Sequence, residues 1–138
     1  MLSYATHATE RSLYNTPNTF AIYMIGLVCE WIESLGGLAG MQTRAAQKSG
    51  SIYEVIDSSG FYSGFAEKAS RSQMNVTFRL PDEELEAKFA REAENAGLIG
   101  LKGHRSVGGL RASIYNAVEP QSVRVLTDFM REFERVNG

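Results

Sequence analysis

The stretch Met74-Asn75-Val76-Thr77-Phe78-Arg79-Leu80 alternates apolar and polar side chains without a break. A period of two is typical of a strand that is buried on one face. Pro81-Asp82-Glu83-Glu84 follows at once and suits the start of a helix, because acidic side chains are favourable at a helix N-terminus. The next residues carry an apolar stripe at helical spacing, formed by Leu85, Phe89, Ala93 and Ala96. This region therefore predicts a strand that leads directly into a helix.

Downstream of this unit, Asn95-Ala96-Gly97 predicts the end of the helix, and residues 98–101 predict a short strand. A second alternating stretch, residues 110–115, places Arg111 on the face opposite Leu110 and Ala112. Glu119-Pro120 predicts the start of the last helix. The apolar side chains of that helix follow one face: Val123, Leu126, Met130, Phe133 and Val136.

Upstream, residues 17–35 predict a helix, with Pro17 in its first turn and Thr16 as its N-cap. This helix is apolar on nearly all sides, so we expect it to be buried on more than one side, in an interface between subunits or between domains. Gly36-Gly37 ends it, and residues 38–56 predict a second helix. Residues 1–16 show little periodicity and predict an extended lead-in. Together the elements predict an α+β fold, in which helices cover a small, mainly antiparallel sheet.

The 138 residues suit one domain, and their composition, 43% hydrophobic and 22% charged, is ordinary for a soluble globular protein. The net charge is −2 and the basic residues are spread out, which argues against a nucleic-acid or membrane-surface partner. No run is apolar and long enough to span a bilayer, and no secretion signal is expected. Cys29 is expected to be a buried thiol in a reducing compartment, and one Cys with two His predicts no metal site.

A glycine-rich stretch carries the candidate chemistry, Gly103-His104-Arg105-Ser106-Val107-Gly108-Gly109-Leu110-Arg111. Glycine permits tight turns and close approach of a ligand to the backbone. Arginine offers a planar fork of donors that matches a carboxylate or a phosphate, and histidine adds a further donor. The combination predicts a site for two anionic groups. The alternative is an ordinary glycine-rich loop with solvated arginines.

This stretch resembles the phosphoserine aminotransferases, as do two others: Leu13-Tyr14-Asn15-Thr16-Pro17 with Thr19-Phe20, and Ala112-Ser113-Ile114-Tyr115-Asn116-Ala117. These are pyridoxal-phosphate enzymes of serine biosynthesis. The resemblance runs from about Tyr14 to Gly138 and covers their C-terminal part. It implies the C-terminal small domain of fold-type I aminotransferases at residues 17–138. Residues 1–16 would then be a lead-in segment with a loop that contacts the cofactor phosphate.

The resemblance implies roles for particular residues. Asn15 and Thr16 would bind the cofactor phosphate of a neighbouring subunit, unless Thr16 only caps a helix and Asn15 only shapes a turn. His104 and Arg105 would bind the phosphate of the substrate, and Arg111 would bind its α-carboxylate. Phosphoserine and 2-oxoglutarate would be the substrates of a cytoplasmic homodimer.

Such an enzyme also needs a lysine that holds the cofactor covalently. The family carries it in a large domain that precedes this segment, so we expect no catalytic residue here and no activity of the isolated chain. The run Ala46-Gln47-Lys48-Ser49-Gly50 superficially echoes the lysine motif, but it falls within a predicted helix. The alternative function is a stand-alone anion-binding or dimerisation module without catalysis.

Overall fold

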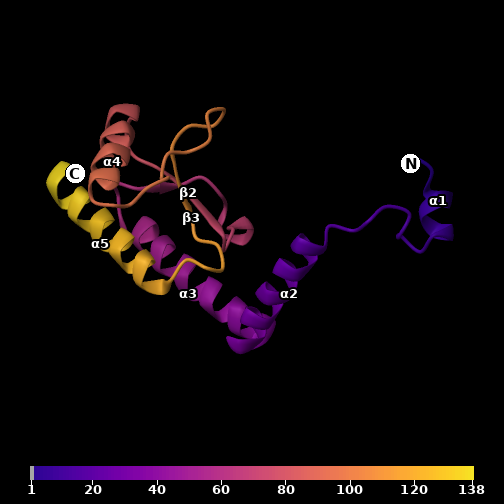
Figure 1. The fold of residues 1–138 in the computed structure, drawn as a ribbon. Coiled ribbons are helices and arrows are strands. Elements are labelled where there is room, and N and C mark those ends of the chain that lie inside the picture. Colours follow the sequence, from indigo (N-terminus) through magenta and orange to yellow (C-terminus); the bar gives the residue numbers. More distant parts are fainter. Residues whose placement is uncertain (1) are drawn as a thin grey trace. The chain divides into compact units, whose positions relative to one another are not determined.

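The computed structural model describes residues 2–138, which form two compact units (Figure 1). The first unit ends at Leu38, and the second comprises Ala39–Gly138. The first contains helices α1 (Tyr4–Thr9) and α2 (Thr19–Ser34). The second contains most of α3 (Gly37–Ser58) and every later element.

Two predictions of secondary structure for the first unit are wrong. Residues 1–16 are not simply extended, because Tyr4–Thr9 form a helix that is too short to show an apolar stripe. The N-cap of α2 is Asn18 and not Thr16, since the Asn18 side chain accepts a hydrogen bond from the Ala21 N–H at 3.1 Å. Asparagine is among the best N-cap residues, and the cap moves the start of the helix two residues beyond Pro17.

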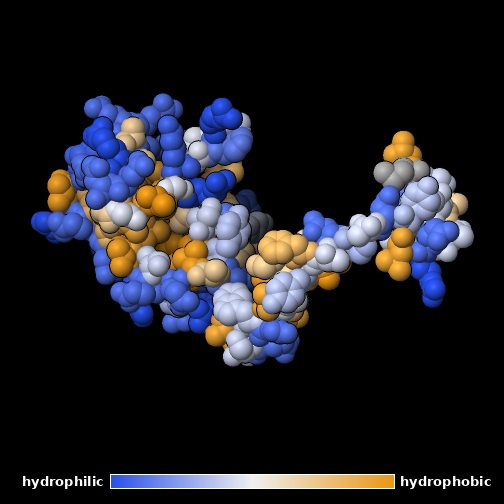
Figure 2. Space-filling view, in the orientation of Figure 1, coloured by the Kyte–Doolittle hydropathy of each residue, from blue (hydrophilic) through white to orange (hydrophobic). Residues whose placement is uncertain are grey.

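Helix α2 buries none of its side chains among the described residues. Phe20 is 72% exposed and Ile25 is 63% exposed, and hydrophobic residues lie at the surface of this helix (Figure 2). The prediction that Cys29 is buried is wrong for residues 2–138, where it is exposed. Its apolar neighbours predicted burial, but no segment of the described chain covers them. So large an exposed apolar surface is unusual for a soluble monomer.

The second unit has the predicted α+β fold. Strands β1 (Ser63–Gly64), β2 (Asn75–Arg79) and β3 (Leu110–Ser113) form an antiparallel sheet in that order. Helices α3, α4 (Glu83–Asn95) and α5 (Pro120–Asn137) gather on one side of β2 and β3 (Figure 1). The predicted strand-to-helix unit is confirmed, with Asp82 as the N-cap of α4 through its bond from the Leu85 N–H at 2.8 Å.

The predicted strand at residues 98–101 is wrong. Gly97 and Gly100 have φ values of +84° and +77°, a backbone conformation that breaks the pleat of a strand. Only an isolated bridge between Lys102 and Leu110 pairs this segment with β3. The two-residue strand β1 and the 3₁₀ helix η1 (Lys68–Ser70) were not predicted, because both are too short to show periodicity.

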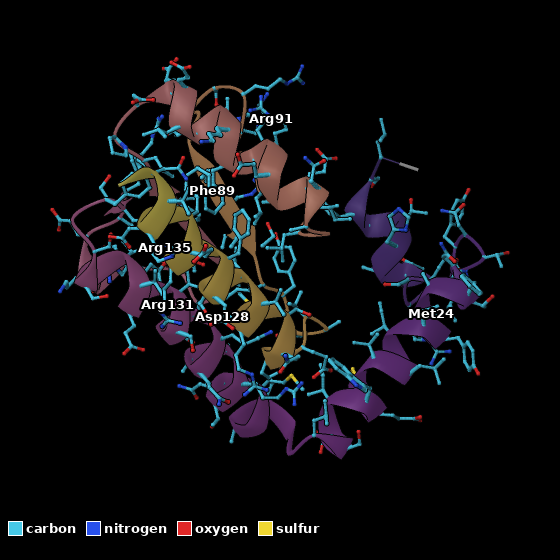
Figure 3. All side chains as sticks on the ribbon, turned by 90° about the vertical axis from the view of Figure 1, so that its left-hand side faces the viewer. Met24, Phe89, Arg91, Asp128, Arg131 and Arg135 are labelled. Atoms are coloured by element: carbon cyan, nitrogen blue, oxygen red, sulfur yellow. The ribbon has the colours of Figure 1, made fainter. Side chains whose placement is uncertain are left out.

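The core of the second unit lies between the sheet and the helices, and aromatic rings fill its centre. Phe89 of α4 is 0% exposed, and its ring centroid lies 5.0 Å from that of Phe133 in α5. Figure 3 shows Phe89 directed inward, whereas Arg91 points away from the outer side of α4. Tyr62 is also buried and donates its hydroxyl to the carbonyl of Met130 at 2.8 Å. Burial raises the pKa of the Tyr62 phenol, and the nearby charge of Glu134 adds to the effect.

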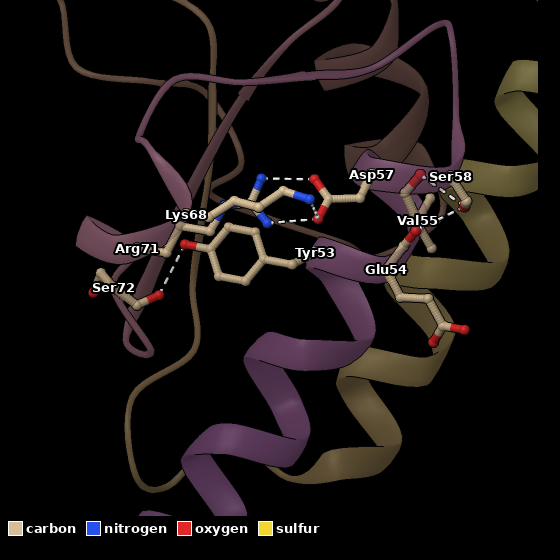
Figure 4. A network of polar contacts seen from close by, with 8 residues as sticks. All are labelled: Tyr53, Glu54, Val55, Asp57, Ser58, Lys68, Arg71 and Ser72. Carbon is tan, nitrogen blue, oxygen red and sulfur yellow. Dashed lines mark hydrogen bonds and ion pairs between the residues drawn. The ribbon is translucent and has the colours of Figure 1, made fainter.

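An ionic network holds the segment between β1 and β2 against the end of α3 (Figure 4). Arg71 donates two hydrogen bonds to Asp57, at 2.8 and 2.6 Å, and its guanidinium carbon lies 4.4 Å from the ring centre of Tyr53. Lys68 lies 3.4 Å from the same carboxylate. The hydrogen bond from Arg71 and the charges of both cations lower the pKa of Asp57 to about 2.

This network predicts a pH-dependent part of the stability. A carboxyl group whose pKa is lower in the folded state stabilises the fold above its unfolded pKa, and this contribution is lost as the pH falls. We expect the wild-type protein to have a larger free energy of unfolding than Asp57→Asn near neutral pH. This difference should disappear as the pH falls from about 4 to about 2. Urea unfolding of both proteins across this range measures the effect. A constant difference between the two proteins from pH 6 to pH 2 would contradict it.

Candidate functional site

Residues 103–109 of the glycine-rich stretch form a narrow loop. The bridge between Lys102 and Leu110, the first residue of β3, joins its two ends. The Gly103 N–H donates to the Gly109 carbonyl at 2.8 Å, which closes the base of the loop. Within it, the N–H groups of Val107 and Gly108 both donate to the His104 carbonyl, at 3.0 and 2.8 Å. A Cβ atom on Gly103 would overlap the Gly108 carbonyl. Glycine at position 103 is therefore required for the two sides of the loop to approach each other.

The ring of His104 is oriented by Ser106. The Ser106 N–H lies 3.2 Å from Nδ1 of His104, and its Oγ lies 2.7 Å from the same nitrogen. A backbone N–H can only donate, so Nδ1 is the acceptor and a neutral ring carries its proton on Nε2. The exposed His104 side chain can thus present an N–H donor to an anion.

The two arginines occupy different parts of the site. Arg105 lies exposed on the loop, and Arg111 lies half-buried on β3, opposite Thr77 of β2. Arg111 points away from the core face, as its place in the alternating strand predicts. Within residues 2–138, neither guanidinium forms a salt bridge, and Nε of Arg111 is buried without a hydrogen-bond partner. Both side chains therefore retain donors for an anionic ligand.

Two adjoining cavities bring these side chains together. A cavity of about 580 Å³ lies between the loop and the first turns of α4, and His104 and Arg105 line it. A smaller one, of about 230 Å³, lies between the loop and the polar face of the sheet, and His104 and Arg111 line it. His104 borders both cavities, so the three predicted residues of the second unit converge on one site.

Arg79 also lines both cavities, and it was not predicted to belong to the site. Its guanidinium donates to the Val107 carbonyl of the loop and lies 3.4 Å from a carboxylate oxygen of Glu86 in α4. The sequence could have indicated that Arg79 belongs to the site, because Arg79 is one of the polar residues in the alternating stretch that ends in Leu80. Its neighbours on that polar face, Thr77 and Arg111, are paired across β2 and β3.

Asn15 and Thr16 lie exposed in the first unit, between α1 and α2. They precede the helix N-terminus, where backbone N–H groups are exposed and anions are favoured. Their predicted contact with a cofactor phosphate remains a prediction.

Lys48 is a buried structural residue of α3. It is 2% exposed, and its ammonium donates to the carbonyls of Ile114, Tyr115 and Val118 at 3.0, 2.7 and 2.9 Å. Burial lowers its pKa and Arg44 adds to that effect, while Glu119 opposes it. All three N–H donors are thus occupied by the turn between β3 and α5. Lys48 therefore has a structural role here, and that it is not the cofactor lysine stays a prediction.

The described residues contain no group of three or more His, Cys, Asp or Glu side chains arranged to hold a metal ion. Within residues 2–138, no single helix combines the length and apolar character needed to cross a membrane. Helices α2 and α3 meet those criteria only as a bent pair, on length and composition alone.

Known proteins with similar sequences are aminotransferases. A model of the family "Aminotransferase class-V" matches residues 1–126. The chain is 56% identical to a phosphoserine aminotransferase of Desulfatibacillum aliphaticivorans over 139 residues, covering 100% of this chain and 38% of that protein. It is 59% identical to one of Geobacillus kaustophilus over 136 residues, covering 98% and 38%. The chain thus spans well under half the length of these relatives.

Solved structures show the same similarity. A phosphoserine aminotransferase from Bacillus circulans subsp. alkalophilus superposes with a TM-score of 0.92 at 54% identity, covering 98% of this chain and 38% of that one. A pyridoxal-phosphate-bound phosphoserine aminotransferase from Trichomonas vaginalis has a TM-score of 0.84 at 39% identity, covering 93% and 37%. Both the sequence and the fold therefore match one segment of these enzymes.

Proposed function

Since the chain belongs to the aminotransferase class-V family, we propose that it forms the C-terminal part of a phosphoserine aminotransferase. The whole protein would transfer an amino group between O-phosphoserine and 2-oxoglutarate. The observation that carries the proposal is the convergence of His104, Arg105 and Arg111 on adjoining cavities, with neither guanidinium in a salt bridge within residues 2–138. The named relatives favour this enzyme over a stand-alone module without catalysis.

The two arginines suit a substrate with an anionic group at each end. Phosphoserine carries a phosphate and an α-carboxylate on a short chain, and 2-oxoglutarate carries two carboxylates. Arg111 would bind the α-carboxylate from its fixed place on β3. Arg105 and the Nε2 donor of His104 would bind the distal group, and a guanidinium accepts either a phosphate or a carboxylate. The more exposed position of the loop suits a group whose shape differs between the two substrates.

The residues of this chain fit one part of pyridoxal phosphate, the proposed cofactor. Asn15 and Thr16 are exposed and carry polar side chains suited to a phosphate group. We expect none of the four lysines to hold the cofactor covalently. Lys48 is buried among carbonyls, Lys68 pairs with Asp57, Lys88 pairs with Glu92, and Lys102 lies beside the loop. When bound, the cofactor takes up the amino group of one substrate and donates it to the next.

The role of this segment would be to bind and orient the substrate. Arg111 would fix the α-carboxylate and with it the position of the amino group, which is how a binding residue contributes to rate. We also propose that residues 1–16 form the lead-in with the phosphate-contact loop and residues 17–138 the small domain. A cytoplasmic homodimer would cover the exposed apolar side chains of α2 and place Asn15 and Thr16 at the cofactor of the partner subunit.

The test is amino transfer by the protein encoded by the whole reading frame that contains this chain. Purified with pyridoxal phosphate, it should form glutamate from phosphoserine and 2-oxoglutarate with steady turnover. A full-length protein that is folded and loaded with cofactor, yet inactive with phosphoserine, would rule out the proposal.

The 138-residue chain by itself should be inactive. We expect none of its lysines to hold the cofactor, so incubation with pyridoxal phosphate should give only the slow rate of the free cofactor. The same glutamate assay measures this, with free pyridoxal phosphate as the control. Turnover well above the control would make Lys48 a candidate for the cofactor lysine after all.

A further inference from the structure

Arg79 connects three parts of the second unit. It ends β2, it lies 3.4 Å from Glu86 of α4, and it donates to the Val107 carbonyl of the loop. Glu86 is itself buried, and its second carboxylate oxygen lies 3.4 Å from the Leu80 N–H. The Arg79 guanidinium therefore links strand β2 and helix α4 of the folded core to the loop that carries His104 and Arg105.

The glycines of the loop pack against this side chain. A Cβ atom on Gly108 would lie 3.1 Å from Nη1 of Arg79, and one on Gly109 would lie 3.0 Å from its Cδ and Nε. Both glycines also have positive φ values, +74° and +69°. The sequence suggested that these glycines allow a ligand to approach the backbone. In the structure, Arg79 packs against both of them, and both also line the larger cavity.

The loop has few other attachments to the core beyond its base. Its internal hydrogen bonds join His104 to Ser106, Val107 and Gly108, all within the loop itself. Among the described hydrogen bonds, the one from Arg79 is the only one that joins the tip residues 104–108 to another element. Loss of this bond would free the tip while leaving the base and β3 in place.

We infer that Arg79 is a positioning residue, which holds the loop so that His104 and Arg105 meet the distal anionic group of the substrate. The inference rests on the proposed function. Arg79 acts through the Val107 carbonyl and need not touch the substrate. Arg111 is attached to the sheet by backbone pairing with β2, so its contact with the α-carboxylate does not depend on Arg79. The effect of Arg79 should therefore be confined to substrates with a distal anionic group.

The experiment compares Arg79→Gln with Arg91→Gln in the full-length protein. Arg91 is an exposed arginine of α4 outside both cavities (Figure 3). We expect Arg79→Gln to raise KM for phosphoserine about five- to twentyfold, with kcat changed by less than about twofold. Its kcat/KM for serine should fall by less than about twofold, since serine lacks the distal anion. Arg91→Gln should match wild type on both substrates.

A second readout tests the loop directly. Amide hydrogen exchange of the peptide covering residues 101–111, measured without substrate, should become about threefold faster or more in Arg79→Gln and stay unchanged in Arg91→Gln. Faster exchange combined with the selective rise in KM supports the inference. Unchanged exchange overturns it, and a rise in KM without faster exchange would mean that Arg79 contacts the substrate itself.

Two further outcomes also overturn the inference. Equal losses on phosphoserine and serine would mean that Arg79 supports the site as a whole. Faster exchange with an unchanged KM would mean that loop position does not govern binding. An inactive wild-type protein would instead refute the proposed function, and the substrate part of the inference with it, while the exchange result would still decide whether Arg79 holds the loop. Thermal unfolding by circular dichroism checks that both variants are folded.

Discussion

Replacing Arg111 by alanine in the proposed full-length aminotransferase is expected to lower kcat/KM for phosphoserine and for serine alike. Arg111 lies on β3 with no salt bridge among the described residues, so its free donors suit the α-carboxylate that both compounds share. Loss of a charge-assisted contact typically costs about 1.5–3 kcal/mol, or roughly ten- to a hundredfold in binding. The total loss should exceed this, because an amino acid held without its carboxylate clamp also loses orientation at the cofactor.

Arg105→Ala is compared with Arg111→Ala to separate the roles of the two arginines. Arg105 is assigned to the distal group, so its loss should mainly erode the preference for phosphoserine over serine. Arg131, exposed on α5, provides the control, and Arg131→Ala should match wild type. The measurement is kcat/KM for each variant with each substrate. If Arg105→Ala and Arg111→Ala lose equally on both substrates, the two arginines support the loop and do not divide the substrate between them.

Replacing Lys48 by methionine is expected to be the most destabilising change at a lysine. Methionine keeps most of the apolar volume but removes the ammonium from the carbonyls of Ile114, Tyr115 and Val118. Buried acceptors left without their charged partner cost several kcal/mol in other proteins, and we expect a loss of about 3 kcal/mol in the free energy of unfolding. Urea unfolding followed by circular dichroism gives this value.

The same variant separates a structural lysine from a cofactor lysine. In the full-length protein, Lys48→Met should keep the absorbance band of the bound cofactor, since Lys48 has no free donor. Lys68→Met is the matched control, because Lys68 is exposed and its ion pair with Asp57 lies at the surface; the change should alter the free energy of unfolding by less than about 1 kcal/mol. Loss of the cofactor band in a folded Lys48→Met protein would show that the structural assignment of Lys48 is wrong.

The sequence predicted the long elements of the fold well, because periodicity needs length. The alternation at residues 74–80 and the stripe through Phe89 correspond to β2 and α4, and the last helix begins at Pro120 as predicted. Short elements without a full period were missed, as α1 and β1 show. The strand predicted at residues 98–101 failed because glycines at positive φ override an apolar run.

The candidate site was only partly predictable. The stretch from Gly103 to Arg111 predicted an anion site formed by a histidine and two arginines. It did not predict that Arg79 would pack beside Gly108 and Gly109. That contact joins positions about thirty residues apart, and no local pattern specifies it. Burial of Cys29 was predicted from its neighbours alone. A sequence shows that a helix is apolar, but it does not show which surface covers it.

The division into two units decides what an optical probe can report. The only tryptophan in the sequence, Trp31, lies in α2 of the first unit, whereas the second unit has the Phe89 cluster and Tyr62 at its centre. Tryptophan emission therefore follows the surroundings of α2, while far-ultraviolet ellipticity, dominated by α3, α4 and α5, follows the second unit. Transitions of the two signals at different urea concentrations would reveal separate melting of the two units, and they need not indicate a partly folded state of either one.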